Sequence, residues 1–170
     1  MTGQPPAVLV ITGAAGAGKS TVGTALAEEP GLLVLDGDVL AVGAAAVAGG
    51  ARDYTGFWRY LLAIAAEVHR NGLVPVFSCI CLPDQVVAAR PDGPVHFLAL
   101  ISGPATVRRR ICDRSVAEPA VDLEFHASFD ATLRGCSTVR PHTFTLLDTT
   151  EQRPAATIAA AREWARGVAG

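Results

Sequence analysis

Lysine is nearly absent from this sequence of 170 residues: Lys19 is the only one, and every other basic side chain apart from the histidines is an arginine. A general bias toward arginine accounts for the arginines, but it does not account for the one exception. Position 19 is therefore a place where the chemistry of lysine itself is needed.

Several features that mark common protein classes are also missing. No apolar run approaches the roughly 20 residues that a membrane-spanning helix needs, and the first apolar segment is short and follows no basic cluster, so it does not predict a signal peptide. A net charge of −2 argues against a general nucleic-acid binder, which needs a basic face. The four cysteines form no Cys-x-x-Cys pair and have no histidine at metal-ligand spacing, so we expect free thiols. We predict a cytoplasmic protein without nucleic-acid or membrane partners, and the sequence predicts no oligomeric state.

Short apolar runs alternate with helical patterns along the chain. Strands are predicted at Ala7–Ile11, Leu32–Leu35, Leu73–Cys81, Val95–Ile101 and Thr143–Leu147. Helices are predicted at 19–28, 55–70, 103–112 and 154–168, and another has Phe125, Phe129 and Leu133 on one face with Pro119 near its first turn. Continuously apolar strands are typical of a parallel sheet that helices cover on both faces. The sequence thus predicts a single three-layer α/β domain over residues 1–170.

The residues around the lysine match the phosphate-binding pattern G-x-x-x-x-G-K-[ST] at every position, in the run Gly13-Ala14-Ala15-Gly16-Ala17-Gly18-Lys19-Ser20. A predicted strand precedes this run and a predicted helix follows it. Glycines let backbone N–H groups approach phosphate oxygens, and the start of a helix adds unpaired N–H donors and partial positive charge. We expect this loop and the next residue, Thr21, to bind ATP. Lys19 would span the β- and γ-phosphates, and the Ser20 hydroxyl would bind Mg²⁺.

Two carboxylates directly follow the second predicted strand, in Asp36-Gly37-Asp38. In a parallel sheet both emerge at the carboxyl edge, where ligands bind, and the glycine between them allows a tight bend. We expect Asp36 to support Mg²⁺ and Asp38 to meet the hydroxyl that attacks the γ-phosphate. The alternative is a turn or a helix cap.

Four arginines lie within seven residues, from Arg108 to Arg114. Arg110 and Arg114 are one helical turn apart and could reach the same ligand. Guanidinium groups stack on adenine and bind phosphates with two hydrogen bonds. We expect a small lid over about 108–120, with Arg110 and Arg114 as catalytic groups. The alternative is a solvated basic end of a helix.

With these pieces in order, the chain resembles the small P-loop kinases, such as the shikimate, gluconate, adenylylsulfate and nucleoside monophosphate kinases, over essentially its whole length. More specifically, it resembles bacterial proteins of the AAA-family ATPase or nucleoside kinase type. The resemblance rests on the phosphate loop, Asp36–Asp38, the pair Arg110 and Arg114, and the run Leu146–Thr150. It implies the three-layer P-loop NTPase fold with a five-stranded parallel sheet. It also implies that adenine lies between the Arg110 region and 149–153, with Thr150 and Arg153 in contact.

The sequence lacks three motifs found in related families, and each absence limits which family the chain can resemble. The third strand is not followed by the Gly-Gly-Gly run of shikimate kinase, so shikimate is not the expected acceptor. No aspartate ends the third strand, where many ATPases carry the acidic residue that supports Mg²⁺, so we expect Asp36 to take that role. The sequence also has no Asn-Lys-x-Asp guanine signature, which argues against a GTPase.

The resemblance also implies where a phosphoryl acceptor binds, in a region of about 38–60 together with 78–85. The residues expected to contact the acceptor are Asp38, Arg52, Tyr54, Trp58 and Cys79. Tyr54 and Trp58 could stack a flat ring, or they could simply lie on a helix surface. We predict an ATP-dependent phosphotransferase acting on a nucleoside, nucleotide, sugar or natural product. The alternative is a regulatory module that binds and hydrolyses ATP without a small acceptor.

Overall fold

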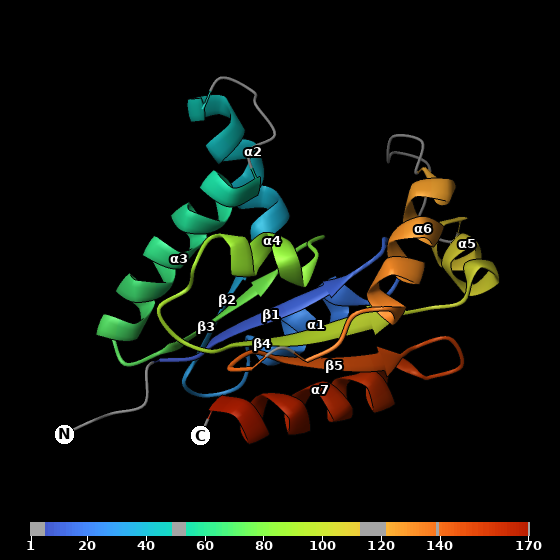
Figure 1. The fold of residues 1–170 in the computed structure, drawn as a ribbon. Coiled ribbons are helices and arrows are strands. Elements are labelled where there is room, and N and C mark those ends of the chain that lie inside the picture. Colours follow the sequence, from blue (N-terminus) through green and yellow to red (C-terminus); the bar gives the residue numbers. More distant parts are fainter. Residues whose placement is uncertain (1–5, 49–53, 113–121, 139, 170) are drawn as a thin grey trace.

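The computed structural model describes residues 6–48, 54–112, 122–138 and 140–169. Five strands form one sheet in the order β2-β3-β1-β4-β5, and every pair of neighbours is parallel (Figure 1). The strands are β1 (Val8–Gly13), β2 (Leu32–Asp36), β3 (Val74–Ser78), β4 (Val95–Ile101) and β5 (Thr143–Asp148). The central strand β1 is buried along its whole length, as a continuously apolar strand between two covered faces should be.

Helices connect the strands and cover both faces of the sheet (Figure 1). They are α1 (Lys19–Leu26), α2 (Gly37–Ala48), α3 (Tyr54–Arg70), α4 (Pro83–Ala88), α5 (Pro104–Cys112), α6 (Leu123–Arg134) and α7 (Pro154–Ala169). Because successive side chains of a strand point to opposite faces, β1 contributes to two cores. Leu9 and Ile11 pack with α1 and α7, whereas Val8 and Val10 pack with α3 and α4.

The predicted three-layer fold with five parallel strands is confirmed, and two helices lie beyond the predicted elements. In α2 the Asp36 carboxylate caps the helix by accepting the N–H groups of Asp38 and Val39, and an alanine-rich sequence follows, which favours helix. In α4 the first helical residue is Pro83, a position that proline favours. The predicted Pro119 near the start of α6 lies outside the described residues.

The third strand is shorter than predicted, ending at Ser78 rather than Cys81. Past Ser78, the backbone N–H and carbonyl of Cys81 bond to the Thr12 side chain instead of to a neighbouring strand. The carboxyl ends of all five strands lie at one edge of the sheet, since the strands are parallel. In the part of the chain that the structure describes, no helix is long and apolar enough to cross a membrane.

Candidate functional site

The loop between β1 and α1 has a backbone that only glycine allows at key points. A Cβ at Gly13 would collide with the carbonyl oxygen of Leu100 on β4, so the loop begins against a neighbouring strand. Gly18, with φ of 108°, occupies the N-cap position of α1, and no side chain caps the helix there. The first N–H groups of α1 are thus left for a ligand, and a helix start of this kind binds anions.

Lys19 lies across this loop. Its Nζ donates to the carbonyl oxygens of Gly13, at 2.8 Å, and Ala14, at 3.3 Å. Burial lowers the pKa of the Lys19 ammonium below its ordinary value, while the nearby carboxylates of Asp38 and, more weakly, Asp36 raise it. The lysine and both aspartates therefore share one electrostatic environment at the carboxyl edge of the sheet.

The two aspartates hold the start of α2 against the end of β3. One oxygen of Asp36 accepts the capping N–H groups of α2, and Oδ1 of Asp38 accepts the N–H of Ile80 at 3.2 Å. A Cβ at Gly37 would lie 2.8 Å from the Cβ of Cys79, so the bend between the aspartates requires glycine. Asp36 therefore caps α2, which is the alternative role given above for this motif. The carboxyl groups of Asp36 and Asp38 are both exposed.

Arg110 supports the phosphate loop through hydrogen bonds. From α5 its guanidinium donates to the Gly16 carbonyl at 3.1 Å and to the hydroxyl and carbonyl of Thr149, at 3.1 and 2.6 Å. Thr149 is buried and in turn donates to the carbonyl of Ala17 at 3.0 Å. Arg110 therefore joins the phosphate loop to the segment after β5. Adenine is predicted to bind between the Arg110 region and that segment, 149–153.

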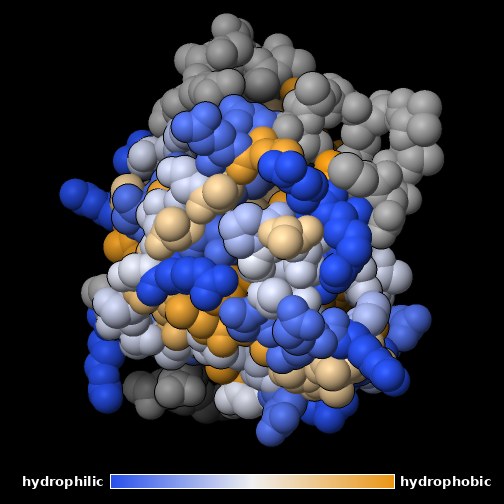
Figure 2. Space-filling view, turned by 90° about the vertical axis from the view of Figure 1, so that its right-hand side faces the viewer, coloured by the Kyte–Doolittle hydropathy of each residue, from blue (hydrophilic) through white to orange (hydrophobic). Residues whose placement is uncertain are grey.

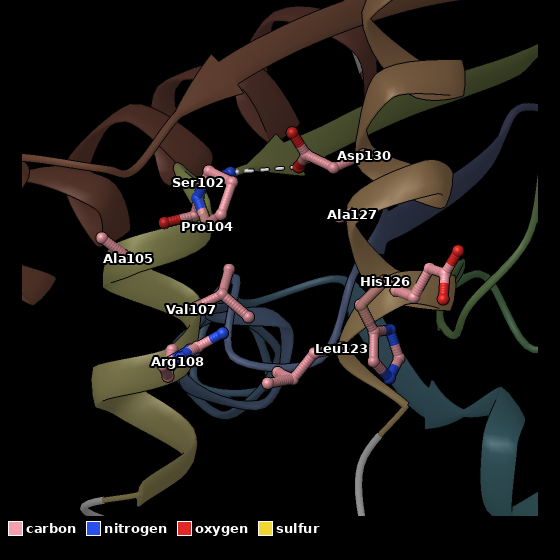
Figure 3. A pocket seen from close by; sticks show the side chains of 10 residues that line it. Ser102, Pro104, Ala105, Val107, Arg108, Leu123, His126, Ala127 and Asp130 are labelled. Carbon is pink, nitrogen blue, oxygen red and sulfur yellow. Dashed lines mark hydrogen bonds between the residues drawn. The ribbon is translucent and has the colours of Figure 1, made fainter.

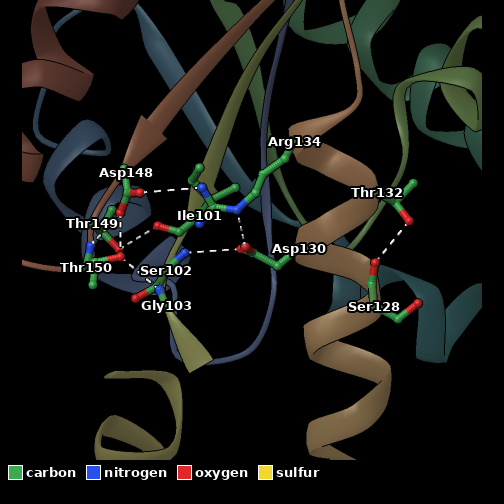
Figure 4. Close-up of polar contacts among 10 residues, drawn as sticks. All are labelled: Ile101, Ser102, Gly103, Ser128, Asp130, Thr132, Arg134, Asp148, Thr149 and Thr150. Atoms are coloured by element: carbon green, nitrogen blue, oxygen red, sulfur yellow. Dashed lines mark hydrogen bonds and ion pairs between the residues drawn. The ribbon is translucent and has the colours of Figure 1, made fainter. Parts of the chain in front are cut away.

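The segment after β5 is held by a polar network (Figure 4). Thr150 Oγ1 donates to Asp148 and accepts the N–H of Gly103. Hydrogen bonds from the hydroxyl and the backbone N–H of Thr150 lower the pKa of the Asp148 carboxyl below its ordinary value. On α6, the Asp130 carboxylate accepts the N–H of Ser102 at 3.1 Å and pairs with Arg134. The strand ends and α6 are thus fixed to one another close to the loop.

A cavity of about 670 Å³ opens between α5 and α6. Figure 3 shows Val107 and Arg108 on α5, Leu123 and His126 on α6, and Ser102 beside Asp130 near the end of β4. Both walls reach the phosphate loop. A Cβ at Gly16 would lie 3.5 Å from the Val107 carbonyl, and the N–H of Ala15 donates to His126 Nδ1 at 3.3 Å.

Two residues predicted to contact an acceptor are buried instead, which corrects those predictions. Trp58 is only 1% exposed and packs edge-on against Phe77 in the core, because its position on α3 faces the sheet. Cys79 is also buried, and its side chain packs against Gly37. Hydrogen bonding with Cys81 and burial raise the pKa of the Cys79 thiol well above its ordinary value.

The remaining predicted residues fall into three groups. Tyr54 is about half exposed at the start of α3, and Arg153 is exposed before α7. Ser20 and Thr21 are exposed at the start of α1. Arg52, Arg114 and most of the predicted lid lie outside the described residues.

Two residues of the site are not among the predicted site residues, namely His126 and Thr149. His126 has no local signal in the sequence, because its partner Ala15 lies 111 positions away. Thr149 belongs to the run Leu146–Thr150, which is one of the motifs that carry the resemblance to the P-loop kinases. The sequence of that run does not indicate that Thr149 bonds to the phosphate loop.

Solved structures share this fold over nearly the whole chain. A sugar kinase from a Janibacter species superposes with a TM-score of 0.74 at 21% identity, covering 97% of each chain. The tunicamycin resistance protein of Deinococcus radiodurans has a TM-score of 0.66 at 19% identity, covering 97% of this chain and 96% of its own. A gluconokinase from Sinorhizobium meliloti has a TM-score of 0.60 at 22% identity, covering 98% of this chain and 95% of its own. No protein-family model and no curated protein matches the sequence. The chain therefore has the fold of the P-loop kinases.

Proposed function

We propose that this protein transfers the γ-phosphoryl group of Mg·ATP to a hydroxyl or phosphate group of a small molecule. The observation that carries the proposal is a glycine-rich loop that leads into a helix start without a side-chain cap, with Lys19 bonded to the loop carbonyls and the charges of Asp38 and Asp36 near enough to act on it. This arrangement unites a polyphosphate cradle, a cation and two carboxylates, which are the parts that phosphoryl transfer uses. ATP as donor is consistent with a cytoplasmic enzyme.

In the proposed reaction the acceptor oxygen attacks the γ-phosphorus, the bond from that phosphorus to the β–γ bridging oxygen breaks, and ADP leaves. Lys19 would exchange its bonds to the Gly13 and Ala14 carbonyls for phosphate oxygens. Asp38 uses Oδ1 for the Ile80 N–H, so its other oxygen is the one proposed to orient the acceptor hydroxyl and take its proton. Positioning and charge stabilisation supply most of the rate enhancement in such a reaction.

The residues present fit a magnesium ion. Among the described residues, no three His, Cys, Asp or Glu side chains form a group that could hold a metal. Mg²⁺ needs no such group, because it keeps several waters and binds one or two protein oxygens together with substrate phosphates. The exposed Ser20 hydroxyl and Asp36 carboxylate would supply the protein oxygens. When bound, the ion would neutralise charge on the β- and γ-phosphates.

The structural neighbours suggest which acceptors to try first. Two of them are named as a sugar kinase and a gluconokinase, and a third as a tunicamycin resistance protein. Another is described as a deoxyadenosine kinase, with a TM-score of 0.54 at 14% identity. A sugar, a sugar acid, a nucleoside and a natural product such as tunicamycin are therefore the classes we propose.

A second candidate function is ATP binding and slow hydrolysis in a regulatory module. It is favoured by the burial of Trp58 and Cys79, which removes two of the predicted acceptor contacts.

Turnover of ATP by the purified protein with Mg²⁺ distinguishes the two functions, measured with and without a panel of the four acceptor classes. The kinase proposal expects one acceptor to raise turnover at least about tenfold and to gain the mass of one phosphate. If ATP is hydrolysed at the same rate with every acceptor and no product is phosphorylated, the module is favoured instead.

A further inference from the structure

The lining of the cavity between α5 and α6 contains a buried hydroxyl group whose hydrogen bonds are unused. Ser102 is 2% exposed and lines the cavity, and its Oγ meets no hydrogen-bond partner among the residues that the structure describes. Burying a hydroxyl without a hydrogen bond costs folding free energy. A hydroxyl of this kind in the lining of a cavity is therefore placed to bond a ligand.

A buried carboxylate lies beside this hydroxyl. Asp130 on α6 is 7% exposed and also lines the cavity. Its Oδ1 accepts the backbone N–H of Ser102 at 3.1 Å, and its Oδ2 accepts from Arg134 at 3.0 Å (Figure 4). A carboxylate oxygen can accept more than one hydrogen bond, so each oxygen retains capacity for a ligand hydroxyl. The negative charge of Asp130 is already paired with Arg134, so it does not require a cationic ligand.

The rest of the lining is mainly apolar, with one charge of each sign. The apolar residues come from both helices, and they are Pro104, Ala105, Val107, Leu123 and Ala127. Arg108 on α5 and Glu124 on α6 are exposed and carry opposite charges. The lining therefore has no excess charge that would select an anion or a cation.

These features suit a neutral molecule with several hydroxyl groups. A volume of about 670 Å³ is in the range of small-molecule pockets, which combine apolar walls with a few convergent polar groups. The hydroxyls of a sugar both donate and accept hydrogen bonds, and its C–H faces pack on apolar side chains. Figure 2 faces the side of the molecule on which α5 and α6 lie in Figure 1, and there small hydrophobic patches alternate with hydrophilic residues.

The cavity is separate from the sites proposed for ATP and for the acceptor. Arg110 on α5 bonds to Thr149, beside which adenine is predicted to bind, whereas Ala105 and Arg108 of the same helix line the cavity. Asp38 follows β2, and two strands lie between β2 and β4, which leads to the cavity. Because neighbouring strands are about 4.8 Å apart, the ends of β2 and β4 are about 14 Å apart.

We propose that the cavity between α5 and α6 is a binding site for a neutral sugar or polyol. The Ser102 hydroxyl and the Asp130 carboxylate bond to hydroxyl groups of the ligand, and the apolar residues of α5 and α6 pack against its C–H groups. The inference goes beyond the proposed function, because binding here needs neither ATP nor phosphoryl transfer.

Isothermal titration calorimetry of the purified full chain without nucleotide tests the inference. The probes are D-glucose, D-sorbitol and trehalose, each beside its monophosphate. We expect at least one neutral probe to bind with a Kd below about 1 mM, and its monophosphate to bind at least about tenfold more weakly.

Ser102→Ala should weaken the bound probe about three- to tenfold, which corresponds to the loss of one neutral hydrogen bond. Its Tm should not fall, since the hydroxyl has no partner to lose among the described residues. Ser128→Ala is the matched control, because it removes a serine hydroxyl at an exposed position of α6 outside the lining. It should leave the affinity unchanged.

Two further variants locate the bound probe. Ala105→Phe places an aromatic ring in the cavity and should abolish binding. Asp38→Asn keeps an oxygen that can accept the Ile80 N–H and should leave binding unchanged. Binding that survives Ala105→Phe but is lost in Asp38→Asn would place the sugar at the acceptor site and overturn the inference.

The inference is also overturned if no neutral probe binds, or if the monophosphate binds as tightly as the neutral probe. If binding depends on Ser102 and Ala105 but no acceptor is phosphorylated, only the kinase proposal fails. If an acceptor is phosphorylated and Ala105→Phe binds the neutral probe as the unaltered protein does, only this inference fails.

Discussion

The ammonium group of Lys19 is held by two carbonyl oxygens of the loop and has Asp36 and Asp38 close by. An arginine carries the same charge, but its planar guanidinium is larger and presents its donors in a rigid fork. The side chain at position 19 must fit between the loop carbonyls and the phosphate oxygens, so a positive charge alone does not make arginine equivalent to lysine there. The residue scale thus gives a physical reason for the one lysine in a chain of arginines.

We expect Lys19→Arg to lower the rate of ATP turnover by about a hundredfold, because losing a well-placed charge-stabilising donor costs about 2.7–4 kcal/mol in related cases. The thermal unfolding temperature should stay within about 2 °C, since the positive charge is kept. Arg166→Lys, at an exposed position on α7, makes the reverse exchange away from the site and should be silent. Lys19→Arg with unaltered turnover would contradict the assigned role.

At the scale of elements, the site depends on how helices hold loops. Gly16 lies against α5, Ala15 against α6, and Ala17 against the segment after β5 through Thr149. The phosphate loop is therefore supported on three sides before any nucleotide is present. Preorganisation of this kind reduces the ordering cost of binding.

Arg110→Ala tests that support. The substitution removes the hydrogen bonds from the guanidinium to Gly16 and Thr149, and it leaves the buried Thr149 carbonyl without this donor. We expect a loss of about 2 kcal/mol in unfolding free energy, or about 4–8 °C in Tm for a chain of this size. Nucleotide affinity should fall with it. Arg109→Ala, an exposed neighbour on the same helix, should change Tm by less than about 1 °C, and equal effects of the two variants would refute a bracing role.

At the scale of the whole molecule, the four histidines make stability depend on pH. Burial lowers the pKa of His69, His96, His126 and His142 below the ordinary value of about 6.5. Below pH 6.5 the unfolded chain therefore binds more protons than the folded chain, so folding stability falls as pH falls. Above that value the histidines are neutral in both states and contribute no pH dependence.

We expect urea unfolding at pH 5.5 to show a lower midpoint than at pH 7.5, with little change between pH 7.5 and 8.5. His96→Gln should reduce the difference, since the His96 ring bonded to Thr143 would no longer compete for a proton. Equal midpoints at pH 5.5 and 7.5 would show that the histidines titrate alike in the folded and unfolded chain.

Much of this architecture could be predicted because the signals are local. β1, the phosphate loop and α1 follow from an apolar run, a glycine pattern and a helix start, and the structure confirms the predicted sheet. Trp58 was misplaced because it was given a ligand-binding role, whereas α3 packs on the sheet through Trp58, Leu61, Ala65 and Val68. These residues follow one another at spacings of three and four, which is the spacing of one buried helix face.

The sequence by itself determined the five strands, the five helices predicted between and after them, and the phosphate loop, since these depend on patterns a few residues long; α2 and α4 were not predicted. It also determined that Asp36 and Asp38 lie at the carboxyl edge of the sheet, because every strand of a parallel sheet ends there. Only the tertiary structure decided which side chains bond to distant backbone groups at this edge: His126 to the Ala15 N–H, Arg110 to the Thr149 carbonyl, and Asp38 to the Ile80 N–H. The reason is that these pairs are separated by 39 to 111 positions, and such contacts are set by the packing of whole helices, which leaves no local pattern in the chain.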